Sequence, residues 1–310
     1  MKICHTFNNE SIVGTVVTIG TFDGVHIGHQ KIIKRLINTA KQSGLKSVIL
    51  TFFPHPRMVL QKDSGIKLIN TISERRKILE DSGLDCLVVK EFTQEFSRLS
   101  AEDFVKQILV ETLKAKKVII GYDHRFGRNR NADINDLKAY GETYGFDVEE
   151  ISAQDIDDVA VSSTKIRAAL SDGDIDKANA YLGYNFCLSG KVIKGKALGR
   201  QLDYPTANIK IEDDYKLVPK HGSYVVRAYI NDDLVYGMMN IGTNPTVAGN
   251  RESIEVHFFN FNENLYDQRI QIELLHRIRD EQKFESVDAL KKQLQKDKEA
   301  SMKFIESHKK

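Results

Sequence analysis

The chain has 310 residues, of which 41% are hydrophobic and 28% are charged, a composition typical of a globular protein with one large core or two ordinary ones. Its 45 Lys and Arg residues nearly balance 43 Asp and Glu residues, so we do not expect the strong positive field of a dedicated nucleic-acid-binding protein. The three cysteines, Cys4, Cys86 and Cys187, lie far apart and form no CxxC pair, which argues against a disulfide scaffold or a zinc ribbon and favours a cytoplasmic protein.

The segment SIVGTVVTIG at 11–20 has the apolar content of a signal peptide. It runs into TFDG without a small-residue cleavage site and alternates as a strand does, so we interpret it as the first core strand. No apolar run approaches the roughly 20 residues that cross a bilayer, so we expect no membrane association. The oligomeric state is left open.

Short apolar runs alternate with helical patterns through the first half of the chain. Strands are predicted at 16–20, 47–53, 86–92, 117–123 and 146–151. Helices are predicted at 29–41, 73–81, 100–113 and 135–145. This alternation is typical of βαβ units, and we expect a Rossmann-like parallel sheet. Ligands bind at the carboxyl ends of the strands of such sheets, where GTFDG, FFPHP and GYDHRFG fall.

The pattern changes after about Tyr184, which predicts a domain boundary with one domain at 1–184 and a second at 185–310. Short alternating strands are predicted at 224–230, 235–241, 253–259 and 268–275. We expect them to close into a small antiparallel β-barrel, because closure removes exposed edges. The segment 172–183 is predicted as a connecting helix. A final helix at 286–307 places Val287, Leu290, Leu294 and Phe304 on one side.

The segment GTFDGVHIGH at 20–29 follows the first predicted core strand. Glycines at 20, 24 and 28 let the backbone approach a ligand, and a helix starting near Ile27 points free N–H groups at it. His26 and His29 lie on one face of that helix and could donate to a phosphoryl oxygen. Either histidine alone favours a solvated turn, whereas the whole spacing favours a phosphate site. The GxxxxGK[ST] pattern of a P-loop is absent from the sequence.

The segment SSTKIR at 162–167 opens a second predicted helix. Ser162, Ser163 and Thr164 are good helix-capping residues, which is the simple explanation. Lys165 and Arg167, however, oppose the dipole of a helix start. A bound anion would explain them, so we favour a phosphate-binding role for Ser162, Ser163, Thr164 and Arg167.

GTFDGVHIGH, TFFPHP, GYDHRFG and VSSTKIR, in this order, resemble the FMN adenylyltransferase module of prokaryotic bifunctional riboflavin kinase/FAD synthetases. The segments GKVIKGKALGRQLDYPTANI, IEVHFF and LYDQRIQIELLHRIRDEQKF resemble the riboflavin kinase module of the same family. The resemblance covers essentially the whole chain. It departs from the family pattern at Phe53, His124 and Asp267, where an acidic residue, phenylalanine and glycine are common.

The second half also has features of a phosphate site. Gly190, Gly195 and Gly199 would form a loop around phosphates and Arg200 would pair with one. Thr206 and Asn208 offer oxygens to Mg²⁺, although PTAN is equally well a turn that enters a strand.

The alternation of SIEVHFF puts Ile254, Val256 and Phe258 on one face and Glu255 and His257 on the other. An inward carboxylate in a barrel would need a partner or a role, and an ordinary solvent-facing glutamate is the alternative.

The resemblance implies two reactions with riboflavin, FMN and ATP as substrates and Mg²⁺ as cofactor. The barrel would phosphorylate riboflavin to FMN with Glu255 as the base. The first domain would adenylylate FMN to FAD, with His26 and His29 stabilising the transition state and Gly20, Phe22 and Gly28 near ATP. Flavin or substrate contacts are implied for His55, Asp123, Arg125 and Arg279. Two alternatives remain open: adenylylation of another phosphate ester, and a nucleotide- or flavin-binding regulator without activity.

Overall fold

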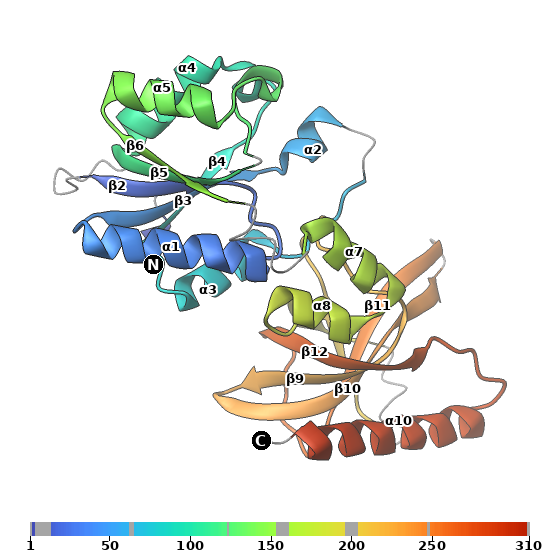
Figure 1. The fold of residues 1–310 in the computed structure, drawn as a ribbon. Coiled ribbons are helices and arrows are strands. Elements are labelled where there is room, and N and C mark those ends of the chain that lie inside the picture. The colour runs from blue at the N-terminus through green and yellow to red at the C-terminus, as the bar shows by residue number, and fades with distance from the viewer. Residues whose placement is uncertain are drawn as a thin grey trace. The chain divides into compact units, whose positions relative to one another are not determined.

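The computed structural model describes residues 2–3, 14–61, 65–122, 124–152, 161–195, 204–246 and 249–308. The chain forms two compact units, Met1–Ser162 and Ser163–Lys310 (Figure 1). The division falls within SSTKIR, and the predicted boundary at 184 stays a prediction.

The first unit is built on a six-stranded parallel sheet, which confirms the predicted Rossmann-like class. Its strand order is β1-β4-β3-β2-β5-β6. The strands are β1 (Lys2–Ile3), β2 (Thr15–Ile19), β3 (Lys46–Phe53), β4 (Cys86–Glu91), β5 (Ala115–Gly121) and β6 (Asp147–Ile151).

Helices cover both faces of this sheet (Figure 1). The helices of this unit are α1 (Ile27–Gln42), α2 (Pro56–Leu60), α3 (Ile72–Asp81), η2 (Phe96–Arg98), α4 (Ala101–Phe104), η3 (Val105–Thr112), η4 (Arg128–Arg130) and α5 (Ile134–Tyr144). Local capping explains several of their starts: Thr71 and Glu74 form a capping box on α3, and Ser100 accepts the N–H of Asp103 at 3.0 Å. The helix predicted at 100–113 therefore begins as predicted, but it widens into π-helical turns from Val105.

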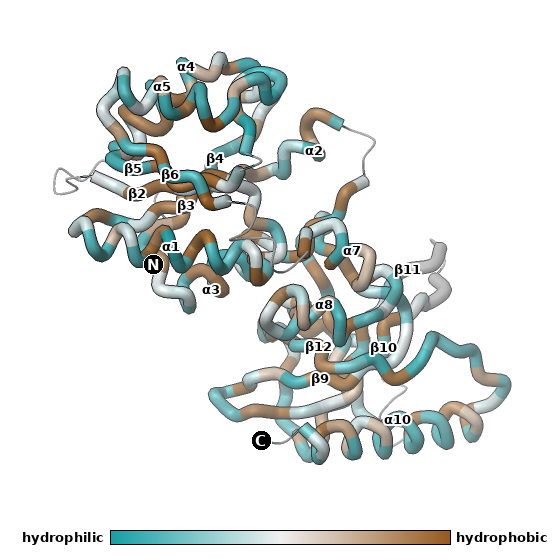
Figure 2. Tube along the Cα trace, viewed as in Figure 1, coloured by the Kyte–Doolittle hydropathy of each residue, from teal (hydrophilic) through white to brown (hydrophobic). Residues whose placement is uncertain are grey.

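Side chains of neighbouring residues in each central strand pack into hydrophobic cores on opposite faces of the sheet, because side chains alternate along a strand. Val16 packs in one cluster with Leu36 of α1 and Leu79 of α3. Val17 packs in the other with Phe104 and Leu137. All five residues of β2 are therefore buried, its threonines included (the strand is coloured by hydropathy in Figure 2).

The second unit combines two helices, a closed barrel and a C-terminal helix (Figure 1). The barrel order is β10-β11-β8-β7-β12-β9 and its pairs are antiparallel, which confirms the predicted small β-barrel. The elements are α7 (Ser163–Asp172), α8 (Ile175–Leu182), β7 (Cys187–Ile193), β8 (Ala207–Lys210), β9 (Gly222–Ile230), β10 (Asp233–Thr246), β11 (Gly249–Phe258), β12 (Arg269–Asp280) and α10 (Val287–His308).

Two details differ from the sequence prediction. Gly190 lies in strand β7 rather than in a loop. A Cβ at this position would lie 2.6 Å from the carbonyl oxygen of Lys210, so close packing of β7 on β8 explains this glycine. Val287, which the sequence places on one side of the last helix with Leu290, Leu294 and Phe304, is 64% exposed. The buried positions of α10 are Asp297, Ser301 and Ile305, one turn apart.

Asp297 is a buried charge whose partners explain how it is tolerated. Arg279 of β12 donates to its carboxylate through Nε at 2.9 Å and Nη2 at 2.7 Å. Gln293 adds a further donor at 2.8 Å. The two bonds from Arg279 hold α10 against the barrel. Among helices in the described ranges, none is both long and apolar enough to cross a membrane.

Candidate active sites

The chain bends sharply between β2 and α1, at the carboxyl end of the sheet. Phe22, Gly24 and Val25 have φ angles of 46°, 85° and 36°, in the left-handed region that favours glycine. A Cβ at Gly20 would lie 3.0 Å from the ring of Phe22, so this glycine allows the ring to fold back over the chain. Gly28 is buried in the first turn of α1. The glycine-rich turn is therefore a tight bend that ends at the two histidines.

His26 and His29 are stacked at the start of α1. Their ring centroids are 3.7 Å apart with an interplanar angle of 16°. His26 is the N-cap residue, and its Nδ1 accepts the backbone N–H of His29 at 3.3 Å. Because Nδ1 is an acceptor, a neutral His26 carries its proton on Nε2, which is then a donor. Nδ1 of His29 is buried and has no hydrogen-bond partner among the described residues.

Both imidazoles are held neutral at pH 7. Burial lowers the pKa of His26 from 6.5 to about 4, although the nearby Asp23 carboxylate opposes the change. Burial also lowers the pKa of His29 well below 6.5, with smaller contributions in the same direction from His26 and the Arg75 guanidinium. A neutral imidazole still has one N–H group, so each ring can donate a hydrogen bond without carrying a positive charge.

This environment predicts the titration of His26. We expect its NMR resonances in the full chain to titrate with a midpoint near 4 instead of 6.5. The unfolded state binds the proton at higher pH than the folded state, so the free energy of unfolding should fall as the pH drops from about 6.5 towards 4. A midpoint close to 6.5 would show that the ring is solvated.

The predicted phosphate residues of SSTKIR lie at the start of α7. Ser163 is the first helical residue and Ser162 precedes it, while Thr164 is exposed and Arg167 half-buried. The helix is anchored through its buried Ile166. This helix lies wholly in the second unit, and its pairing with the histidine turn stays a prediction.

The barrel brings three of the predicted kinase residues together. Glu255 of β11 and Asn208 of β8 are direct antiparallel partners, and the hydroxyl of Thr206 donates to Oε2 of Glu255 at 3.2 Å. Ile254, Val256 and Phe258 are buried, as the alternation predicts, and the half-buried Glu255 lies on the opposite face of the strand.

Two further features adjoin this face. A Cβ at Gly195 would lie 2.7 Å from Oδ1 of Asn208, so the glycine leaves room for the amide. A cavity of about 340 Å³ lies beside Thr206, with Pro205, Phe258, Phe261 and Tyr266 among its lining residues. Gly199 and Arg200, the remaining predicted phosphate residues, lie outside the described residues.

Two families of known proteins match the two halves. Residues 8–165 match the family described as FAD synthetase, and residues 182–305 match riboflavin kinase. A bifunctional riboflavin kinase/FMN adenylyltransferase from Buchnera aphidicola subsp. Schizaphis graminum is 38% identical over 98% of this chain and 99% of its own. The one from Escherichia coli K12 is 34% identical over 97% and 96%. The chain belongs to this bifunctional family. It is an enzyme with an adenylyltransferase module followed by a kinase module.

A solved structure supports the same fold. A crystal structure described as a macrolide-efflux protein from Streptococcus pneumoniae has a TM-score of 0.83 and 32% identity, covering 93% of this chain and 94% of that chain. The correspondence includes both modules, because neither one alone accounts for that coverage.

Two of the predicted flavin residues of the adenylyltransferase module, His55 and Arg125, lie after the carboxyl ends of strands. His55 follows β3 and caps α2, accepting the N–H of Arg57 at 3.1 Å. Arg125 is exposed in the segment after β5. Asp123 lies outside the described residues. The flavin role of these side chains stays a prediction.

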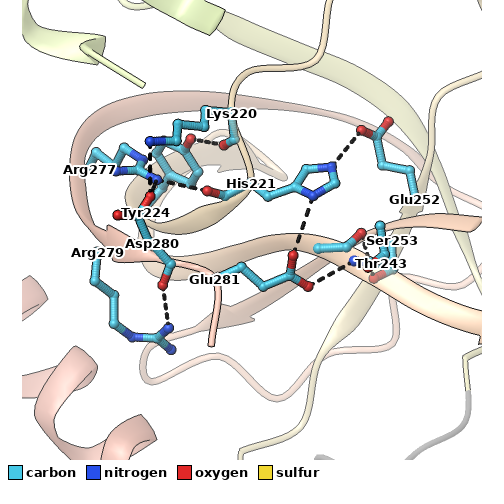
Figure 3. A network of polar contacts seen from close by, with 11 residues as sticks. Lys220, His221, Tyr224, Thr243, Glu252, Ser253, Arg277, Arg279, Asp280 and Glu281 are labelled. Carbon is cyan, nitrogen blue, oxygen red and sulfur yellow. Dashed lines mark hydrogen bonds and ion pairs between the residues drawn. The ribbon is translucent and has the colours of Figure 1, made fainter. Parts of the chain in front are cut away.

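Arg279 of the kinase module lies in a polar network at the end of β12 (Figure 3). Besides Asp297, it donates to the carbonyl oxygen of Asp280 at 2.9 Å. The carboxylate of Asp280 also pairs with Arg277 at 2.7 Å and Lys220 at 3.1 Å. Arg279 therefore anchors α10, and its predicted flavin contact is a separate proposal.

Sequence reasoning missed the residues that support the sites. His257 is one of them: its Nδ1 lies 2.9 Å from the carbonyl oxygen of Pro205 and must donate to it, which holds the start of PTAN. Asp267, where the family commonly has glycine, adopts a φ of 65°. Its carboxylate pairs with Lys191 at 2.8 Å. A strand histidine and a turn aspartate give no sequence signal of these contacts.

Proposed function

We propose that His26, His29, Thr206, Asn208 and Glu255 carry the two activities for which the curated relatives are named, adenylylation of FMN and phosphorylation of riboflavin. The observation that carries the adenylylation part is the stacked and neutral pair of imidazoles at the start of α1, with His26 buried and His29 half-buried. Preorganised N–H donors stabilise charge as it grows on a phosphoryl group without reorganising at the moment of reaction.

In the adenylylation reaction an oxygen of the FMN phosphate attacks the α-phosphorus of ATP. The bond from that phosphorus to the bridging oxygen breaks, and pyrophosphate leaves with the electron pair. His26 donates from Nε2 to the phosphoryl oxygens, and His29 donates beside it. Gly20, Phe22 and Gly28 let the backbone approach the nucleotide. Ser162, Ser163, Thr164 and Arg167 hold the departing phosphates.

In the kinase reaction the terminal ribityl hydroxyl of riboflavin attacks the γ-phosphorus of ATP. Glu255 takes the hydroxyl proton, and ADP leaves with the electrons of the broken phosphorus–oxygen bond. The contact between Glu255 and Thr206 supports this assignment, since it holds the carboxylate on the polar face of β11 beside Thr206. The cavity beside Thr206 offers room for a substrate, with Gly195, Gly199 and Arg200 as the proposed phosphate contacts.

The donor set of this face fits Mg²⁺. Thr206 and Asn208 contribute a hydroxyl and an amide oxygen, and hard oxygen ligands completed by substrate phosphates are what Mg²⁺ prefers. Among the described residues there is no group of three His, Cys, Asp or Glu that could hold a metal by itself. We propose Thr206 and Asn208 as the protein ligands; when bound, the ion would neutralise charge on the phosphates. Cys86 and Cys187 are buried and form no disulfide, which fits a cytoplasmic location.

A time course tests the assignment of both activities. The purified full chain is incubated with riboflavin, ATP and Mg²⁺, and the flavins are separated by chromatography. FMN should appear first and FAD should follow. If FAD forms from supplied FMN but not from riboflavin, the assignment of riboflavin phosphorylation to this chain is wrong. No turnover of either flavin would favour a binding protein without activity.

A further inference from the structure

Two fully buried charges lie beneath the histidine turn. Asp23 belongs to the turn between β2 and α1, and Arg75 belongs to α3. Each side chain is 1% exposed, and Nη2 of Arg75 lies 3.4 Å from Oδ1 of Asp23. Neither residue was singled out for a role by the sequence. A buried ion pair is weak evidence for stability, because apolar residues of similar volume often serve as well.

The other bonds of the pair are made to the turn itself. Nη1 of Arg75 donates to the carbonyl oxygen of Thr21 at 2.7 Å and to the hydroxyl of Thr51 at 3.3 Å. That hydroxyl in turn donates to the same carbonyl at 3.1 Å. The carboxylate of Asp23 accepts the backbone N–H groups of Ile69 and Asn70, each at 3.2 Å. The turn is thus tied to β3, to α3 and to the segment before α3.

The turn needs such support because its backbone is strained. Phe22 and Val25 adopt positive φ angles that residues with a Cβ rarely adopt. Strained conformations persist only where the surroundings over-determine them, and they cluster at functional sites. The bend places the ring of Phe22 5.0 Å from that of His29. Val25 directly precedes His26, so the path of the turn decides where both imidazoles stand.

The charges also act on the histidines. Burial and the adjacent His26 lower the pKa of His29, and the Arg75 guanidinium lowers it further. Asp23 has the opposite influence on His26. Arg75 and Asp23 therefore affect the histidines mainly by fixing the backbone of the turn, and secondly through their charges.

We propose that Arg75 and Asp23 are positioning residues of the adenylylation reaction, which hold the strained turn so that His26 and His29 face the transferring phosphoryl group. The inference rests on the proposed role of the histidines in adenylylation. Arg75 touches no reacting atom and acts through the turn. Displacement of catalytic groups by about 1 Å can cost about 100-fold in rate.

The test compares Arg75→Met with Lys77→Met in the full chain. Lys77 lies on the same helix in an exposed pair with Asp81, so its loss should leave both reactions unchanged. For Arg75→Met we expect kcat of FMN adenylylation to fall about 100-fold, with the KM values for FMN and ATP little changed. Riboflavin phosphorylation in the same sample should be retained and shows that the kinase module is folded, while the unchanged KM values for FMN and ATP show that the adenylyltransferase module is folded. A raised KM with an unchanged kcat would overturn the proposal.

A double-mutant cycle separates positioning from a general structural role. If Arg75 acts through the histidines, Arg75→Met should slow His29→Ala only slightly, because the group it positions is already gone. Equal fold-losses in both backgrounds would contradict the inference. If instead His29→Ala alone leaves adenylylation intact, the proposed role of the histidines is wrong. That result is distinct from a failure of the positioning role of Arg75 and Asp23.

A milder variant covers the case in which Arg75→Met does not fold. Thr51→Val keeps the side-chain shape but removes the hydroxyl that bonds to both Arg75 and Thr21. We expect a loss in kcat of about 5- to 10-fold, smaller than the loss from a full displacement. A Thr51→Val enzyme with normal kcat and a normal response to His29→Ala would also overturn the proposal.

Discussion

FMN adenylylation is expected to slow by about 10²- to 10³-fold when His29 is replaced by alanine, while riboflavin phosphorylation is retained. The substitution removes a half-buried imidazole that stacks on His26 and contacts Phe22. It also removes a donor from the start of α1, where charge grows on the phosphoryl group. In the chromatographic time course FMN should accumulate and FAD should be almost absent.

A matched control and a conservative variant sharpen this experiment. Lys34→Ala changes an exposed residue of the same helix and should leave FAD formation normal. His29→Gln restores an N–H donor and should recover part of the lost rate. If FMN and FAD formation fall together in His29→Ala, the two reactions do not use separate sites.

The reverse result is expected for Glu255→Gln. Riboflavin phosphorylation should fall by about 10²- to 10⁴-fold, the range for loss of a general base. FAD made from supplied FMN should be unaffected. Glutamine has nearly the same shape and can still accept the hydroxyl of Thr206, so the change removes the proton acceptor and keeps the packing. Initial rates with riboflavin and with FMN as separate substrates measure the two effects.

Glu252→Gln is the matched control for this variant. Glu252 is an exposed carboxylate on the same strand, 3.3 Å from His221 (Figure 3). Its neutralisation weakens a surface contact of little energetic weight and should leave phosphorylation near normal. Near-normal phosphorylation by Glu255→Gln would rule out its role as the base.

Local patterns were sufficient for the architecture. The alternation of apolar runs and helical segments in the first half predicted a parallel sheet, because strands buried on both faces are continuously apolar. The period-two pattern of SIEVHFF identified the buried Ile254 and Val256 and set Glu255 on the other face. Long ordered motifs such as GTFDGVHIGH identified the family.

Local patterns failed to predict the role of a residue where that role depends on contact with a residue far away in the sequence. Gly190 has the composition signal of a phosphate loop, yet it is a strand residue whose missing Cβ admits the backbone of β8. Val287 fits an apolar stripe, but Asp297 occupies the packed side of α10 because Arg279 neutralises it. The contact of Gly190 with β8 and the contact of Asp297 with Arg279 both join different secondary-structure elements, so the periodicity of one element could not predict them.

The sequence by itself determined the fold class, the two modules and the family, because these depend on repeated periodicity and on motifs whose residues are adjacent. Only the tertiary structure decided the protonation of His26 and His29 and the pairing of Asp23 with Arg75. These properties depend on burial and on contacts between side chains 52 positions apart in the chain. The free energy of a charge is set by the groups folded around it, and a linear pattern does not contain that information.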